Sequence, residues 1–177
     1  IVIFGGSQGA RAINNAMIDA LPKLRETGAP LRITHQTGEA DFEKVRQAYA
    51  EAGADGADVR PYITDMVAEF EKADLIISRA GATTCAEVAA AGKASLMVPL
   101  PSAADDHQRK NAEAMAKDGA VSIILQSDLS GDSLAERLIE LLNDPDKLAE
   151  MGAAARRLAR PDAAEATVDL IEGLRKK

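Results

Sequence analysis

The sequence contains a single cysteine, Cys85, and no tryptophan among its 177 residues. One cysteine excludes an internal disulfide framework, and a chain without disulfides is expected in a reducing, cytoplasmic compartment. Aromatic residues are scarce as well, with three Phe and two Tyr, whereas alanine is abundant. We therefore expect one compact domain whose core consists of small and aliphatic side chains, with helices packed closely on a sheet.

The sequence also lacks an excess of basic charge and any long apolar run. Its formal net charge of -7 argues against nonspecific nucleic-acid binding, because such binding needs a basic footprint. No apolar stretch approaches the roughly 20 residues of a membrane-spanning helix, and no signal peptide is visible. The chain opens on Ile1-Val2-Ile3-Phe4 without an initiator Met, so we expect it to be part of a longer protein.

Short apolar runs alternate with helical patterns along most of the chain. Strands are predicted at residues 1–4, 31–36, 59–63, 74–78, 94–98 and 121–125. This alternation predicts an α/β fold with a six-stranded parallel sheet and helices on both faces, in three layers. Further helices are predicted at residues 131–142, 145–158 and 161–174. We divide the chain into a domain of residues 1–160 and a C-terminal helical segment of residues 161–177.

Polar and glycine-rich segments follow the predicted strands. They lie at residues 5–10, 35–38, 63–65, 78–84 and 99–108. The carboxyl ends of parallel strands meet at one edge of a sheet, which is where such folds bind their ligands. The convergence of these segments therefore predicts one binding site at that edge.

The segment from Ser78 to Gly92 carries the most specific pattern. An apolar strand leads through Gly81 into a helix whose first residues, 82–84, are Ala, Thr and Thr. The start of such a helix presents unpaired backbone N–H groups and a partial positive charge, which favours phosphate. Glu87 lies about one turn further along, where its carboxylate could accept hydrogen bonds from two sugar hydroxyls. We interpret this segment as part of a nucleotide-sugar site, although most glutamates on helices are ordinary surface residues.

A glycine-rich turn follows the first predicted strand. Gly5 and Gly6 allow positive φ angles and a close approach of the backbone to a ligand. Ser7 can cap the following helix or offer its hydroxyl to a phosphate oxygen. The turn matches neither the dinucleotide fingerprint nor a P-loop, so a tight packing turn explains it equally well on its own.

The run Asp105-Asp106-His107-Gln108 suggests a metal site at first sight, because carboxylates and imidazole are metal ligands. Adjacent positions at a helix start do not converge on one point, however. Acidic residues favoured by the helix dipole are the simpler interpretation. His107, Gln108 and Asn111 would then face one side of the helix and could hydrogen-bond sugar hydroxyls.

Three other side chains have both a chemical and a structural interpretation. His35 could be a general base, but a packed or capping histidine is favoured. A small buried hydrophobe is likewise favoured over a reactive thiolate for Cys85. Arg79 could approach phosphate or pair with an acid.

Several motifs appear together and in order. They are GGSQGA at 5–10, HQTG at 35–38, YITDM at 62–66, SRAGATTCAEVAAAGK at 78–93, VPLPSAADDHQRKNA at 98–112 and RPDAA at 160–164. Together they resemble the MurG family, glycosyltransferases that add N-acetylglucosamine to undecaprenyl-pyrophosphoryl-N-acetylmuramyl-pentapeptide. The similarity runs over essentially the whole chain but covers only the C-terminal half of that family's proteins. It implies the donor-binding, Rossmann-like half of a GT-B glycosyltransferase.

The resemblance also implies roles for individual residues in binding UDP-N-acetylglucosamine. The implied diphosphate and sugar contacts are Ser7, Ala82, Thr83 and Thr84, with Cys85 and Ala86 completing the helix turn. The implied nucleoside contacts are the Ile63 backbone at the uracil edge, Met66 beside it and Glu87 on the ribose. The implied N-acetylglucosamine contacts are Gln108, with Asn111 and His107. One departure stands out, because Ser102 occupies a position where the family often has His.

The resemblance implies further properties of the whole protein. The acceptor site, the catalytic base and the membrane-docking patch belong to an N-terminal domain that this chain lacks. We therefore expect no catalytic residue, metal or cofactor in this chain, and no transfer by the chain alone. The lipid-linked acceptor would reach the enzyme through the missing domain, peripherally at the cytoplasmic side of a bacterial inner membrane, while this domain itself would be soluble.

Alternatives remain open at this point. The chain could be the donor domain of another GT-B lipid glycosyltransferase, a noncatalytic subunit of a split glycosyltransferase, or a generic doubly wound binding module. In GT-B proteins the last helix tends to cross back to the partner domain. If it does so here, part of its apolar face would be exposed and the isolated domain could self-associate.

Overall fold

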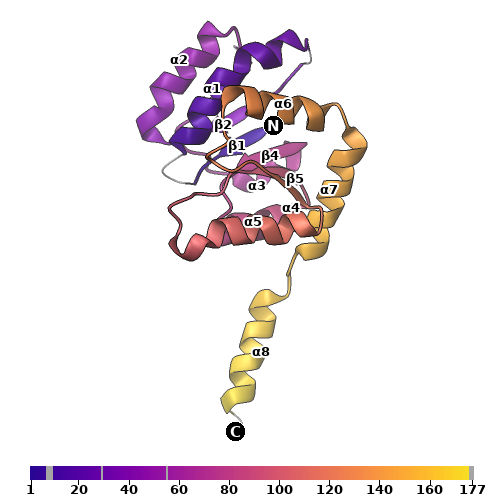
Figure 1. Ribbon diagram of the computed structural model, residues 1–177. Coiled ribbons are helices and arrows are strands. Elements are labelled where there is room, and N and C mark those ends of the chain that lie inside the picture. The colour runs from indigo at the N-terminus through magenta and orange to yellow at the C-terminus, as the bar shows by residue number, and fades with distance from the viewer. Residues whose placement is uncertain (7–9, 29, 55, 176–177) are drawn as a thin grey trace.

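The computed structural model describes residues 1–6, 10–28, 30–54 and 56–175. A sheet lies at its centre between the helices (Figure 1). It has six strands, in the order β3-β2-β1-β4-β5-β6. All neighbouring strands are parallel. The strands are β1 (Val2–Phe4), β2 (Thr34–Gln36), β3 (Asp58–Arg60), β4 (Leu75–Ser78), β5 (Ala94–Met97) and β6 (Val121–Ile123). The predicted six-stranded parallel fold is confirmed.

Helices cover both faces of this sheet. They are α1 (Arg11–Glu26), α2 (Phe42–Glu51), α3 (Met66–Lys72), α4 (Ala82–Ala91), α5 (His107–Lys117), α6 (Gly131–Leu142), α7 (Pro145–Leu158) and α8 (Ala163–Arg175). Short 3₁₀ turns, η1 (Glu39–Asp41) and η2 (Ala104–Asp106), precede α2 and α5. Within the described ranges, no helix is both long enough and apolar enough to cross a membrane.

Alternate residues of the strands point to opposite faces and divide the core in two. Ile3, Leu75 and Ile77 pack with α1, α2 and α6 in one buried cluster. Val2 and Ile76 pack with α3, α4 and α5 in the other. Helix α7 contributes to both clusters, so it closes the end of the sheet between the two layers.

Several strands are shorter than predicted, and β3 shows why. Its ladder ends at Arg60, whereas the apolar pattern extends to Ile63. Asp58 and Arg60 make the bonds to β2, whereas the Gly38 N–H bonds to the Pro61 carbonyl at 3.1 Å and breaks this alternation, so the ladder stops at Arg60. The next residues form a loop that leads to α3, whose first turn is capped by the Asp65 carboxylate accepting from the Ala68 N–H at 3.0 Å.

Helix α8 leads away from the body of the molecule after α7, as the yellow segment of Figure 1 shows. It begins at Ala163, two residues later than the predicted start. Four apolar side chains on it are more than half exposed, namely Val168, Leu170, Ile171 and Leu174. Burying such a stripe would be worth several kcal/mol, at roughly 1.5–3 kcal/mol for each large aliphatic side chain.

Candidate functional site

A cavity of about 470 Å³ lies at the carboxyl ends of the central strands. Strand order reverses between β1 and β4, and such switch points are where open α/β sheets bind ligands. The turns after β1, β4 and β5 line it, through Gly5, Gly6, Ala10, Arg11, Arg79, Gly81, Thr83, Thr84, Leu100 and Gln108. The predicted convergence is confirmed for three of the five segments, 5–10, 78–84 and 99–108, whereas segments 35–38 and 63–65 do not line this cavity.

The first turn of α4 borders this cavity. Its first helical hydrogen bond runs from the Cys85 N–H to the Gly81 carbonyl at 2.9 Å. The amides of residues 82–84 therefore precede the helical ladder and face outward from the helix start. Thr83 and Thr84 add hydroxyl groups to the same wall. Amides, hydroxyls and the positive end of the helix dipole together favour an anionic group in this cavity.

The glycine-rich turn forms the opposite wall. A Cβ on Gly5 would lie 2.2 Å from the Ala10 Cβ, so a side chain cannot fit there. Gly6 has space around it but a φ of +88°, which favours glycine for conformational reasons. Ser7, the predicted diphosphate contact, lies outside the described residues. The close packing at Gly5 fits a tight packing turn, and the place of both glycines on the cavity wall fits a close approach to a ligand. The two interpretations of the glycines are therefore compatible.

Two arginines line the cavity. The Arg79 guanidinium donates to the carbonyls of Val98 at 3.0 Å and Pro99 at 3.3 Å, and to Gln126 Oε1 at 2.7 Å. Among the described side chains no carboxylate pairs with Arg79, so of its two alternatives the structure does not show the pairing with an acid. Partial burial lowers the pKa of Arg79 below its usual range, yet an arginine remains protonated. Arg11 lies 3.5 Å from an Asp41 oxygen and has a largely exposed side chain.

A second cavity of about 390 Å³ lies between α3 and α4. Apolar atoms of Met66, Val67, Phe70, Ala90 and Ala91 line most of it, and Glu87 stands at its side. The far end is closed by two cations that bond to carbonyls, Lys93 to Glu71 and Ala73, and Arg156 to Ala90 and Ala91. The structure thus brings the predicted base contact Met66 and the predicted ribose contact Glu87 into one groove.

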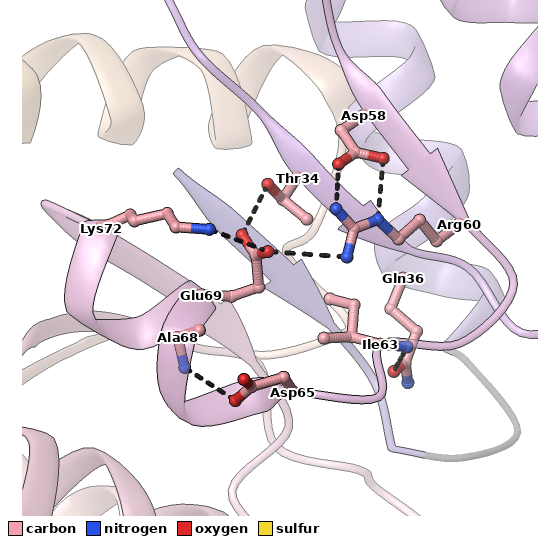
Figure 2. A network of polar contacts seen from close by, with 9 residues as sticks. All are labelled: Thr34, Gln36, Asp58, Arg60, Ile63, Asp65, Ala68, Glu69 and Lys72. Carbon is pink, nitrogen blue, oxygen red and sulfur yellow. Dashed lines mark hydrogen bonds and ion pairs between the residues drawn. The ribbon is translucent and has the colours of Figure 1, made fainter.

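One of the two backbone groups of Ile63 is already bonded inside the protein. Its side chain is buried, and its N–H donates to Gln36 Oε1 at 2.8 Å (Figure 2). The predicted backbone contact with a base is therefore restricted to the Ile63 carbonyl, because the N–H is already satisfied inside the protein. Sequence reasoning missed this because it depends on which side chain the end of β2 presents to the loop after β3.

Gln108 and Asn111 hold the turn before α4. Gln108 Oε1 accepts from the N–H groups of Ala80 at 3.2 Å and Leu100 at 3.1 Å. Asn111 Nδ2 donates to the Ala80 carbonyl at 3.1 Å. These bonds use half of each side-chain amide, so the predicted sugar contacts of Gln108 and Asn111 are limited to the other half. Gln108 nevertheless lines the first cavity, as expected for a ligand contact.

His107 does not share their direction. Its Nδ1 lies 2.7 Å from the Ala104 carbonyl, and the residue is exposed. The expectation that His107, Gln108 and Asn111 face one side is therefore wrong for His107. Asp105 and Asp106 lie directly before α5, as predicted for acids at a helix start, with φ angles of 50° and 55° and no side-chain cap bond. Among the described residues, no three His, Cys, Asp or Glu side chains gather as a metal site.

His35 and Cys85 have the structural roles that the sequence favoured. His35 is fully buried, with Nε2 3.1 Å from Asn14 Oδ1 and Nδ1 3.0 Å from the Tyr49 hydroxyl. Since Asn14 Oδ1 can only accept, Nε2 carries the proton and Nδ1 accepts from Tyr49. Burial lowers the pKa of His35 to about 4, which keeps it neutral. Burial also raises the pKa of the Cys85 thiol to about 11, so it is not a thiolate at neutral pH.

Comparison with known families gives a direct match. Residues 1–167 match the glycosyltransferase family 28 C-terminal domain. The chain belongs to this family. Membership confirms the resemblance drawn from the motifs and the assignment of the fold to the C-terminal half of a GT-B glycosyltransferase.

Relatives of this family 28 domain carry one consistent name. Proteins of Geotalea uraniireducens and Geobacter sulfurreducens are each 52% identical over 169 residues, covering 96% of this chain and 46% of the relative. Both are named UDP-N-acetylglucosamine–N-acetylmuramyl-(pentapeptide) pyrophosphoryl-undecaprenol N-acetylglucosamine transferase. The chain therefore spans about half the length of the curated relatives it matches.

Solved structures agree with this assignment. Acinetobacter baumannii MurG is 43% identical with a TM-score of 0.88, covering 97% of this chain and 49% of that one. The S. aureus MnaA–UDP co-structure is 14% identical with a TM-score of 0.68, covering 97% of this chain and 44% of that chain, and shows a likeness of fold alone.

Proposed function

We propose that this family 28 domain binds UDP-N-acetylglucosamine as the donor half of an inverting glycosyltransferase. The full protein would add N-acetylglucosamine to undecaprenyl-pyrophosphoryl-N-acetylmuramyl-pentapeptide in peptidoglycan synthesis. One observation carries the proposal: a single helix, α4, borders both cavities. Thr84 and Glu87 are three residues apart on it, about 4.5 Å along the axis, so a phosphate and its adjoining ribose can contact consecutive turns.

The diphosphate would lie in the first cavity. Amides of Ala82, Thr83 and Thr84, with the two threonine hydroxyls, supply hydrogen-bond donors to its oxygens. Arg11 and Arg79 line the same cavity and supply positive charge without needing to bond directly. Ser7, by its place in the glycine-rich turn, is proposed as a further contact.

The nucleoside would extend from there into the groove between α3 and α4. The Ile63 carbonyl can accept from N3–H of uracil, and the Met66 side chain offers an apolar surface to the ring. The Glu87 carboxylate can accept from both ribose hydroxyls, a pairing that discriminates strongly because its lone pairs are unpaired without them. Small side chains at Cys85 and Ala86 leave room for the sugar to approach the helix.

The N-acetylglucosamine would lie at the turn after β5. The Gln108 oxygen is occupied by two backbone amides, which leaves its Nε2 to donate to a sugar oxygen. Asn111 donates through Nδ2 to Ala80, so its Oδ1 is the atom left to accept from a sugar hydroxyl. His107 is the more distant candidate, since its ring turns toward Ala104.

Transfer would take place in one displacement. An acceptor hydroxyl attacks the anomeric carbon, the bond from that carbon to the diphosphate oxygen breaks, and UDP leaves. Donors fixed at the start of α4 stabilise the negative charge that develops on the leaving group, which is the electrostatic contribution of this half. The base that takes the acceptor proton is proposed to lie in the other half, so this chain alone would not catalyse transfer.

The other half would also account for α8. The exposed stripe of Val168, Leu170, Ile171 and Leu174 is proposed to pack against the N-terminal domain in the full protein. The same stripe gives the isolated chain a surface for self-association. Contact with the lipid-linked acceptor, peripherally at the cytoplasmic side of the inner membrane, is likewise proposed to be made through that other half.

Calorimetric titration with UDP, UDP-N-acetylglucosamine and UDP-glucose tests the proposal. Glu87→Ala should weaken UDP binding at least tenfold, because two charge-assisted hydrogen bonds are lost. Glu43 is exposed on α2, away from both cavities, so Glu43→Ala is the matched control and should bind UDP as wild type does. Equal affinity of wild type and Glu87→Ala for UDP would contradict the proposed place of the nucleotide. Equal affinity of wild type for UDP-N-acetylglucosamine and UDP-glucose would contradict the choice of N-acetylglucosamine as the donor sugar.

A further inference from the structure

Gln36 connects the two ends of the proposed nucleotide site. It is the last residue of β2 and pairs with Phe4 of β1 on one side and Arg60 of β3 on the other. The glycine-rich turn follows β1, and the loop containing Ile63 follows β3. The Gln36 side chain therefore stands between the segment proposed for the diphosphate and the segment proposed for the base.

Both ends of its amide group are used. Nε2 donates to the Gly6 carbonyl at 2.8 Å, and Oε1 accepts from the Ile63 N–H at 2.8 Å. The residue is only 2% exposed, so water does not compete for these bonds. Figure 2 shows the Gln36 amide directed at the Ile63 backbone beside the start of α3. A buried amide with both groups bonded is expensive to leave unsatisfied, so each bond fixes its partner.

The Gly6 end is the one that needs fixing. Gly6 has a φ of +88°, and among the described residues no atom lies within 4 Å of where its Cβ would be. A glycine has more backbone freedom to lose than any other residue. The bond from Gln36 is therefore a specific restraint on a peptide that lines the first cavity.

The Ile63 end has a different consequence. Because Gln36 takes up the Ile63 N–H, the backbone offers a base its carbonyl, which suits an N–H donor on the base edge. Asp65, two residues on, then caps α3 and leads Met66 into the groove. The direction of this whole segment is thus tied to the position of the glycine-rich turn.

We propose that Gln36 is a positioning residue that couples the diphosphate turn to the base-binding loop, an inference that rests on the proposed function. It touches neither phosphate nor base itself. Its effect is to hold the two cavities in the relative position that one nucleoside diphosphate needs, so binding of the whole ligand gains more than binding of the nucleoside alone.

Calorimetric titration of the 177-residue chain with uridine and with UDP measures this effect as a ratio of affinities. Gln36→Met keeps the approximate length of the side chain but removes both polar groups. It should weaken UDP binding at least tenfold and lower the ratio of UDP to uridine affinity at least threefold. Val45 of α2 is buried on the opposite face of the sheet. Val45→Ala is therefore the control, because it lowers stability and should leave the ratio of affinities unchanged.

Gln36→Glu separates the two bonds. Its carboxyl can still accept from Ile63, but it can donate to the Gly6 carbonyl only when protonated. The affinity ratio, taken relative to wild type at each pH, should therefore be low at pH 8 and recover toward wild type at pH 5.5. Loss of fold alone does not produce such a recovery.

Each outcome decides between the ideas. A folded Gln36→Met variant with wild-type UDP affinity overturns the role of Gln36 while leaving the proposed function intact. If Gln36→Met does not fold, a wild-type ratio for Gln36→Glu at both pH values overturns it instead. Failure of wild type itself to bind UDP overturns the proposed function, and the role of Gln36 with it.

Discussion

The two faces of the sheet are filled differently. On the face of α1, α2 and α6, polar groups are enclosed and satisfied, with His35 bonded between Asn14 and Tyr49. On the face of α3, α4 and α5, the packing leaves a groove between α3 and α4, and the start of α4 also borders the cavity at the carboxyl ends of the central strands. Adjacent residues of β2 show the contrast. The His35 side chain is bonded on the face of α1, α2 and α6, which we call the closed face, whereas the Gln36 side chain bonds to Gly6 and Ile63 in the loops of the candidate site. With the role proposed for Gln36, adjacent polar residues at one strand end serve different purposes according to the face they enter.

Truncating a core side chain on the closed face should have the largest effect on stability and no effect on UDP binding at the site. Leu138 of α6 is fully buried in the closed cluster. Leu138→Ala should lower the free energy of unfolding by about 3 kcal/mol, through lost burial and the cavity it leaves. Urea unfolding measures this loss, with Val67→Ala in the open groove as the control, since that side chain is 70% exposed. A comparable loss in both variants would mean that the faces do not differ as described.

Acid should weaken the closed face through His35. Its pKa is about 4 in the folded chain and about 6.5 when unfolded, so the unfolded state binds more protons between these values. Stability should therefore fall as the pH falls from 6.5 to 4, by up to about 3 kcal/mol from this group. Urea unfolding at pH 7, 5.5 and 4 should show a shallower decline for His35→Gln than for wild type. Parallel declines would show that His35 is not the group responsible.

Removing the charge of Glu69, a buried residue of α3, should have a smaller effect on stability. Glu69 is 7% exposed and accepts from Thr34 at 3.2 Å, with Arg60 and Lys72 within 3.5 Å (Figure 2). Glu69→Gln keeps the shape and loses the charge, so unfolding should become easier by about 1–2 kcal/mol. Asp58→Asn, which alters a more exposed pair with Arg60, should cost under about 1 kcal/mol. The reverse order would argue that β3, not Glu69, anchors α3.

The smallest effect is expected at Cys85. Its thiol is half-buried with a pKa of about 11, so alkylation by iodoacetamide at pH 7.5 should be slow compared with a free thiol in the unfolded chain. Cys85→Ala should change the free energy of unfolding by less than about 1 kcal/mol, because only a small apolar contact is lost. Rapid alkylation of the folded chain would contradict the burial of this side chain.

The sequence alone was sufficient to predict the layers of the fold and the edge of the sheet at which the candidate site lies. Alternating apolar runs and helical spacing set the order of elements, and glycine-rich or hydroxyl-rich segments at strand ends converge because parallel strands share an edge. β3 shows why boundaries were less certain, since the apolar pattern continued to Ile63 whereas the pairing with β2 ended at Arg60.

Hydrogen-bond partners across the fold were beyond reach of the sequence. The Ile63 N–H bonds to Gln36, and Gln108 bonds to Ala80 and Leu100, because the register of distant strands brings them together. Local patterns carry no record of that register. Helix spacing likewise suggested one direction for His107 and Asn111, whereas the left-handed conformations at Asp105 and Asp106 change how α5 begins.

The central claim is that one nucleoside diphosphate spans both cavities along α4. A crystal structure of the chain with UDP tests it most directly. We expect the diphosphate at the amides of Ala82–Thr84, the ribose at Glu87 and the uracil against Met66 and the Ile63 carbonyl. Ligand density lodged elsewhere, or none at a saturating concentration, would contradict the claim.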